Sequence, residues 1–113
     1  MPRVADILER EYDLGLISDR EIPSLAVSAT TSDEILRVDP NRLALTIINT
    51  GAFAVMVRPI GSASTTNGIL LAANGGGISL FYREDYVLTT RRWTAIAIGT
   101  ASTLYVLEQT SIT

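Results

Sequence analysis

The side chains that most often do chemistry in proteins are missing from this sequence. Its 113 residues include no histidine and no cysteine, and all nine basic residues are arginine. The chain therefore lacks the commonest general base, the thiol nucleophile and the amine that forms Schiff bases. Carboxylates, hydroxyls, arginines and aromatic rings are the groups that remain. We expect a structural or binding protein and not an enzyme.

Two pairs of neighbouring carboxylates are the candidates for acid–base work, Asp33-Glu34 and Glu84-Asp85. Each pair lies at an expected loop or strand edge, and neighbours in a strand point to opposite faces. The Asp-x-Asp-x-Asp alternation of a calcium loop does not occur. We expect surface or capping roles for these acids, with no metal and no cofactor. A cation site built from several chains at a symmetry axis is the alternative.

The glycine-rich stretch Asn74–Gly77 superficially resembles a phosphate-binding loop. A P-loop needs a lysine, and a dinucleotide fingerprint needs a helix after its glycines. Here a strand-like run, Ile-Ser-Leu-Phe-Tyr, follows instead. The pattern therefore predicts a turn. The many Ser and Thr residues offer no nucleophile, since there is no Gly-x-Ser-x-Gly elbow and no histidine to activate one.

Aromatic rings are the remaining candidates for ligand binding. Trp93, Tyr82, Tyr86 and Tyr105 could form a platform that stacks on sugar rings. A β domain with one tryptophan, four tyrosines and two phenylalanines also needs such rings for packing. We expect Trp93 to anchor the core or a subunit interface, with carbohydrate binding as the alternative.

Charge is distributed unevenly along the chain. Residues 1–39 carry nine acids and four arginines, net −5, whereas residues 40–113 carry three acids and five arginines, net +2. An acidic leader on a weakly basic body predicts that the leader lies on a neighbouring subunit or on its own body. Arg91 and Arg92 could meet the leader of a neighbour; solvated arginines and a solvated acidic arm are the alternatives. Because the basic residues are few and unclustered, we expect no nucleic-acid partner.

Length and composition favour one domain that associates with other chains. The hydrophobic fraction is 47%, which is high for a small protein that must cover itself with polar surface. No apolar run approaches the ~20 residues of a membrane span, so we expect no membrane partner. High apolarity without a membrane signal points to surface buried against other protein chains.

The first residues predict a short helix over 2–12. Pro2 suits a first helical turn, and Val4, Ile7 and Leu8 follow helical spacing. So short a helix is marginal alone, and its apolar stripe needs a surface on which to dock. A polar connector is expected over 13–23. We therefore divide the chain into an N-terminal helix and arm, 1–24, and a β-sandwich domain, 25–113.

From residue 25 the sequence predicts strands. Runs rich in β-branched residues alternate with turn signals, and no second helical pattern occurs. The expected fold is all-β: an antiparallel β-sandwich or jelly-roll-like body behind a short N-terminal helix and extended arm. The candidate strands are residues 25–29, 34–38, 42–49, 53–59, 68–72, 78–82, 86–89, 93–99 and 103–109.

Three of these strands are apolar on both faces, namely residues 43–48, 53–57 and 93–98. A sheet with one face in water would alternate apolar and polar residues. We therefore expect some outer faces to meet another subunit; small residues tolerated on a wet face are the alternative. The expected oligomer or partner interface comprises Val4, Ile7, Leu8, Ile48, Met56, Arg91, Arg92, Trp93, Ile96 and Ile98.

About two-thirds of the chain carries a family resemblance. The segments NRLALTIINTGAFAVMVRP, STTNGILLAANGGGISL and RRWTAIAIGTASTLYVLEQ resemble small β-sandwich structural proteins of tailed bacteriophages, including capsid-decoration and head-fibre proteins. The motifs are an Ile-x-Asn-x-Gly strand end, a strand ending in proline, Gly-Ile-x-Leu, a glycine-rich turn, Trp-x-Ala-Ile-Ala and a final Tyr-Val-x-Glu strand. The matching positions are Ile48, Asn49, Gly51, Pro59, Gly68, Ile69, Leu71, Gly75 to Gly77, Trp93, Ala95 to Ala97, Tyr105, Val106 and Glu108.

The resemblance implies a virion structural protein on the capsid surface. The expected function is a decoration (cement) protein that binds the major capsid protein as a homotrimer and stabilises the head shell. The alternative is a tail or fibre adhesion module that binds host-surface glycans. These motifs are typical of a fold and carry no catalytic residues, and the acidic leader lies outside the match.

Overall fold

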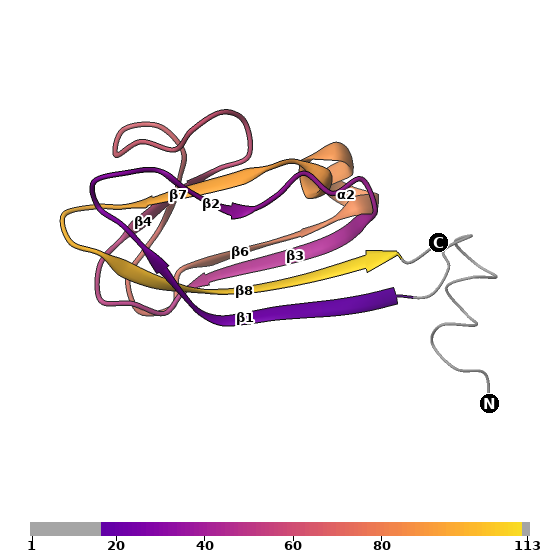
Figure 1. The fold of residues 1–113 in the computed structure, drawn as a ribbon, viewed down its shortest axis with the longest axis horizontal. Coiled ribbons are helices and arrows are strands. Elements are labelled where there is room, and N and C mark those ends of the chain that lie inside the picture. The colour runs from indigo at the N-terminus through magenta and orange to yellow at the C-terminus, as the bar shows by residue number, and fades with distance from the viewer. Residues whose placement is uncertain (1–16, 112–113) are drawn as a thin grey trace.

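The computed structural model describes residues 17–111, which form two sheets packed face to face (Figure 1). Most connections between strands are short; the longer ones are residues 59–68 between β4 and β5, and the two helical turns between β6 and β7. The strands are β1 (Ile17–Val27), β2 (Asp33–Leu36), β3 (Arg42–Asn49), β4 (Val55–Arg58), β5 (Ile69–Leu71), β6 (Gly77–Phe81), β7 (Trp93–Ala97) and β8 (Ser102–Ser111). The turns are α2 (Tyr82–Asp85) and the 3₁₀ helix η1 (Tyr86–Thr90).

The strands pair from the two ends of the chain inward, the first with the last. The first sheet runs β1-β8-β3-β6 and the second β2-β7-β4-β5, all antiparallel. The pairs β1–β8, β2–β7, β3–β6 and β4–β5 are those of one long hairpin rolled up on itself, the strand order of an eight-stranded jelly roll. The expected all-β fold with two antiparallel sheets is confirmed.

The core lies between the two sheets and follows from the alternation of two central strands. In β3 and β8 every second side chain is buried, with Leu45 and Ile47 facing the same interior as Leu104 and Val106. From the second sheet, Trp93 enters this core with only 1% of its surface exposed. The strict period of two fixes the register, because a slip by one residue would turn these side chains to the outside.

The outer face of the second sheet is apolar, and the chain covers it itself. Met56 and Ile96, cross-strand partners in β4 and β7, point away from the core and pack with Ala63. Ala63 belongs to the β4–β5 connection, residues 59–68, and its amide donates to Thr94 Oγ1 at 2.8 Å. Thr94 Oγ1 in turn donates to the carbonyl of Gly61 at 3.2 Å. Two-sided apolarity in these strands thus reflects a cluster within one chain.

The Ile-x-Asn-x-Gly strand end joins connections at one end of the sandwich. The fully buried Asn49 amide donates to the carbonyls of Phe53 and Leu71 at 2.8 and 3.0 Å. Its Oδ1 accepts from the Gly51 amide and from Ser102 Oγ at 3.0 and 3.1 Å. A Cβ on Gly51 would collide with Ser102 Oγ and would lie 2.7 Å from the amide nitrogen of Thr103, so a larger residue would force the backbone to shift. We call this the Asn49 end and the opposite one the Arg42 end.

Two expectations about elements are wrong. The expected polar connector is a strand from Ile17 onward, because Ile17–Val27 pairs along β8 as an edge of the first sheet. Pro23 fits there because a bulge between Ile22 and Leu25 leaves it outside the regular ladder. The expected boundary between residues 24 and 25 therefore falls inside β1. Residues 86–89, expected as a strand, belong to η1. The helix expected over 2–12 lies outside the described residues.

Candidate docking site at the Arg42 end

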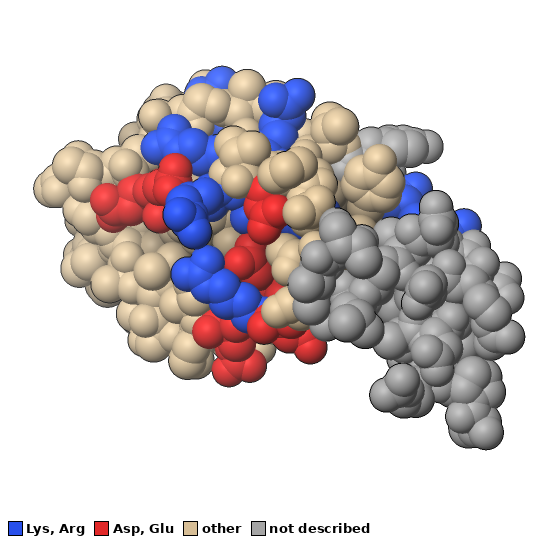
Figure 2. All heavy atoms as spheres, turned by 45° about the vertical axis from the view of Figure 1, so that its right-hand side comes forward, with Lys and Arg blue, Asp and Glu red and all other residues tan. Residues whose placement is uncertain are grey.

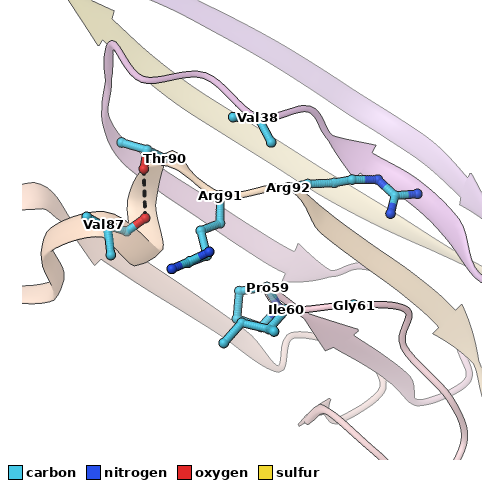
Figure 3. Close-up of a pocket in the computed structure, with 8 residues that line it drawn as sticks. All are labelled: Val38, Pro59, Ile60, Gly61, Val87, Thr90, Arg91 and Arg92. Atoms are coloured by element: carbon cyan, nitrogen blue, oxygen red, sulfur yellow. Dashed lines mark hydrogen bonds between the residues drawn. The ribbon is translucent and has the colours of Figure 1, made fainter.

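Three connections meet around a hollow of about 410 Å³ at the Arg42 end (Figure 3). They are the β2–β3 connection, the start of the β4–β5 connection, and η1 with the two residues after it. Val38, Ile60 and Val87, one from each connection, stay 67%, 56% and 55% exposed. Exposed apolar side chains gathered in this way are typical of surfaces that contact other molecules. The lining residues are Val38, Pro59, Ile60, Gly61, Val87, Thr90, Arg91 and Arg92.

Local hydrogen bonds hold these connections in place. The Thr90 hydroxyl donates to the carbonyl of Val87 at 2.8 Å, which closes the 3₁₀ turn. The Asp39 amide donates to the carbonyl of Thr90 at 3.0 Å and so ties the β2–β3 connection to this turn. Gly61, at φ 74°, makes the tight turn after Ile60 that places this side chain on the rim.

The two adjacent arginines of the hollow have different surroundings. Arg92 turns away, and its Nε lies 2.6 Å from Glu34 Oε2 in a half-exposed ion pair. Arg91 points between Val87 and Ile60 (Figure 3). Within residues 17–111 its guanidinium has no hydrogen-bond or ion-pair partner. The hollow thus presents one uncompensated positive charge among apolar side chains.

A buried arginine fixes the wall behind the hollow. Arg42, 2% exposed, places its Nε 2.7 Å from Glu108 Oε2. Its other nitrogens donate to the carbonyls of Thr89, Arg91 and Arg37 at 3.2, 3.1 and 2.7 Å. A register shift between Arg42 and Ala44 lets both Arg42 and Leu43 be buried. Bulges re-aim side chains in this way.

This role of Arg42 could not be predicted from the sequence. A single arginine at the start of an apolar strand looks the same whether it is buried or solvated, and the bulge that decides between them has no clear sequence signal. Arg20, 60% exposed, adds a longer ion pair of 3.4 Å to the same Glu108 carboxylate. Figure 2 shows acidic and basic side chains side by side in one band on this face.

The residues expected at an interface differ in their exposure to solvent. Trp93, Met56 and Ile96 are 1%, 8% and 9% exposed, so a single chain already buries them and they offer no surface to a partner. Ile48 and Ile98 are half-buried, and Arg91 and Arg92 are exposed. Val4, Ile7 and Leu8 lie outside the described residues.

The outer face of the first sheet is more open than the outer face of the second sheet, which residues 59–68 cover. Ile48 lies there between Tyr105 of β8 and Gly77 of β6. Thr46 Oγ1 lies 2.9 Å from Ser79 Oγ on the same face, and Phe81 is 41% exposed. No described segment covers this face in the way that residues 59–68 cover the other.

The candidate aromatic residues whose side chains the structure describes, Trp93, Tyr82 and Tyr105, do not form a common platform; the side chain of Tyr86 lies outside the description. Trp93 lies in the core, where its Nε1 donates to the carbonyl of Leu88 at 3.1 Å. Tyr105 lies on the outer face of the first sheet, where its hydroxyl donates to Glu21 Oε2 at 3.1 Å. Partial burial, reinforced by this carboxylate, raises the pKa of Tyr105 above its ordinary value of 10.0. Tyr82, 46% exposed, lies on α2.

Asp33, Glu34 and Asp85 of the two acidic pairs have structural partners, and the side chain of Glu84 lies outside the description. Asp33 accepts from the amide of Ser28 and the hydroxyl of Thr31 at 3.2 and 3.4 Å, and Asp85 accepts from the amide of Phe81 at 2.9 Å. In the part of the chain that the structure describes, no three acidic, histidine or cysteine side chains gather into a metal-binding group. None of the helices in that part is long and apolar enough to cross a membrane.

Comparison with known proteins shows a fold likeness. No family model matches the chain, and no curated protein matches it. A solved structure with a similar fold is that of Bacillus endospore appendages, described as a family of disulfide-linked pili. The TM-score is 0.51 with 10% sequence identity, over 86% of this chain and 89% of the other.

At this identity the likeness extends to the fold alone. The present chain has no cysteine, so disulfide linkage of the kind named for those pili is not open to it.

Proposed function

We propose that this chain is a structural protein of a tailed-bacteriophage virion, a decoration protein that binds the head shell as a homotrimer. The observation that carries the proposal is the exposed apolar rim of Val38, Ile60 and Val87 at the Arg42 end, held in place by the buried Arg42. Rigid apolar surface of this kind suits contact with another protein. The jelly-roll strand order and the sequence resemblance support a virion component.

The mechanism would rest on contact area and not on chemistry. A standard protein interface buries about 800 Å² per partner. A trimer that bridges neighbouring capsomers adds such contacts only in the assembled shell, and its three copies multiply weak contacts through effective concentration. The major capsid protein is the proposed partner, and resistance of the shell to internal DNA pressure is the proposed benefit.

The test is binding to phage heads that lack the protein. Purified chain is added to such heads, bound protein is measured by co-sedimentation, and its position is imaged by electron cryomicroscopy. We expect saturable binding and threefold density on the head surface. Density on the tail or fibre tip, with bare heads, would contradict the proposal and favour the adhesion module.

A second candidate is a subunit of a protein filament, favoured by the fold likeness to pilus-forming appendages. The two candidates differ in how copies are related. A head-to-tail contact that closes gives a ring such as a trimer, whereas the same contact without closure gives a filament. Negative-stain microscopy of the concentrated chain separates them, because discrete particles favour decoration and fibres favour the filament.

A further inference from the structure

The hollow at the Arg42 end combines exposed apolar side chains with a positive charge that is unpaired within residues 17–111. Its rim exposes Val38, Ile60 and Val87 to water, and its interior holds the Arg91 guanidinium without a partner among the described residues. None of the described residues that line it is acidic. An occupant that is both apolar and anionic would cover the rim and neutralise the arginine. This chemistry excludes a purely apolar peptide and disfavours a basic one.

The N-terminal segment of this chain, residues 1–16, has both properties. Val4, Ile7 and Leu8 are apolar at close spacing, and Asp6 lies among them. The segment carries four acids and two arginines, so its side chains have a net charge of −2. Charge and apolar content together match the hollow.

The topology places the segment near such a hollow. Ile17, the first residue of β1, pairs with Ser111, whose amide donates to the carbonyl of Asn41 at 2.7 Å. The segment therefore leaves the sandwich at the Arg42 end. Sixteen residues reach at most about 53 Å when extended, far enough to cross to an adjacent copy.

We propose that the hollow formed by Val38, Pro59, Ile60, Val87 and Arg91 receives the N-terminal segment of a neighbouring copy of this chain. The inference rests on the proposed function, because the exchanged segments would be the contact that holds the proposed homotrimer together. Each copy donates its segment to the next and receives one from the copy before. A cyclic exchange among three copies closes the trimer.

The first experiment titrates a fluorescein-labelled peptide of residues 1–16 with the full chain and follows fluorescence anisotropy. We expect saturable binding that weakens about tenfold with Arg91→Glu, since an attractive charge contact becomes repulsive. The matched control is Arg37→Glu, the same change at an exposed arginine outside this hollow. Equal affinity for the two variants would overturn the proposal.

Changes in the peptide test the same contact without touching the fold. A peptide with Val4, Ile7 and Leu8 replaced by serine keeps its charge and loses its apolar side chains. We expect no measurable binding of this peptide. If it binds as tightly as the natural sequence, the apolar rim is not the receiving surface.

Mixing two variants decides between neighbouring copies and a single copy. Arg91→Glu breaks the hollow and spares the segment, whereas Asp6→Arg with Glu9→Arg breaks the segment and spares the hollow. We expect each full-length variant to sediment mostly as monomer, and the mixture to form mixed oligomers in sedimentation velocity. Variants that stay monomeric when mixed would show that the segment does not link copies, including the case in which it folds back onto its own chain.

The outcomes also separate this inference from the proposed function. If the peptide and mixing experiments fail while the chain still decorates phage heads, the occupant of the hollow is wrong and the function stands. If copies exchange segments but do not bind heads, the contact stands and the virion role is wrong.

Discussion

Trp93 lies in the core and has no surface with which to stack on a sugar. We expect Trp93→Ala to lower the free energy of unfolding by about 3–5 kcal/mol, because it removes a large buried ring. Thermal and denaturant melts measure this loss. Tyr82→Ala, at an exposed aromatic residue, is the matched control and should leave stability nearly unchanged. An unchanged melting temperature for Trp93→Ala together with lost binding to host cells would instead promote the adhesion module.

Arg42 and Glu108 form a buried ion pair whose remaining donors are used by backbone carbonyls. We expect Arg42→Met to destabilise the fold by about 3–5 kcal/mol, because Glu108 would stay buried without its main partner. The control is Arg92→Met, which breaks the half-exposed pair with Glu34 and should cost about 0–1 kcal/mol. Equal losses in urea denaturation would show that burial does not distinguish the two pairs.

The hydroxyl of Tyr105 should ionise at a higher pH in the folded protein than in the unfolded chain, since its folded pKa is raised. The folded state then holds the proton more tightly, so the stability it contributes is present below pH 10 and is lost as pH rises through the folded pKa. Absorbance titration of tyrosinate, with Tyr105→Phe subtracted, measures the value. Glu21→Gln should move it back toward 10; no movement would contradict the role of Glu21.

Strand β1 determines how much of the N-terminus can be deleted without loss of stability. Deleting residues 1–16 leaves the β1–β8 ladder whole, whereas deleting residues 1–22 removes the six residues that pair with β8 before the bulge. We expect the shorter deletion to melt near the full chain and the longer one clearly lower, as followed by circular dichroism. Both should weaken binding to heads. Identical melting of the two would mean that the first half of β1 adds no stability.

Strand β3 could be predicted because an apolar, β-branched run lies between turn signals. Residues 42–49 were predicted with the observed bounds. The first half of β1 could not be found in this way. Ser18 to Glu21 are all exposed at the sheet edge, so no apolar period marks them. Residues 86–89 have strand-like composition, but tertiary contacts override it: η1 buries Thr89 and offers the Leu88 carbonyl to Trp93.

The candidate site was predictable only in part. Arg91 and Arg92 were singled out because they are adjacent cations in a chain with few of them. Among the described residues, Arg92 is paired and Arg91 is not, because β2 places Glu34 beside Arg92. The rim residues Val38, Ile60 and Val87 were not predicted. Single apolar residues in loops carry no period, and only the meeting of three connections makes them a surface.

For the whole molecule, the open outer face of the first sheet predicts association. Light scattering of the purified chain should give the mass of a trimer. Ile48→Asp should shift it toward monomer, because burying an unpaired carboxylate is unfavourable. Thr100→Asp, at an exposed connection on the Asn49 end, is the control. Binding to heads should survive ~0.5 M salt, which screens surface charges and leaves apolar contacts intact. A stable monomer at micromolar concentration would contradict the trimer.

The central position of β8 determines when the first sheet can form during synthesis of the chain. This last strand of the chain is central in its sheet, between β1 and β3, and the Arg20–Glu108 contact joins residues 88 positions apart. During synthesis, β1 and β3 therefore have no common neighbour until the carboxyl-terminal residues have been translated. The first sheet therefore cannot be completed until β8 has been made, and structures rich in distant contacts fold slowly. Until then Leu45 and Ile47 lack Leu104 and Val106, their β8 neighbours in the core.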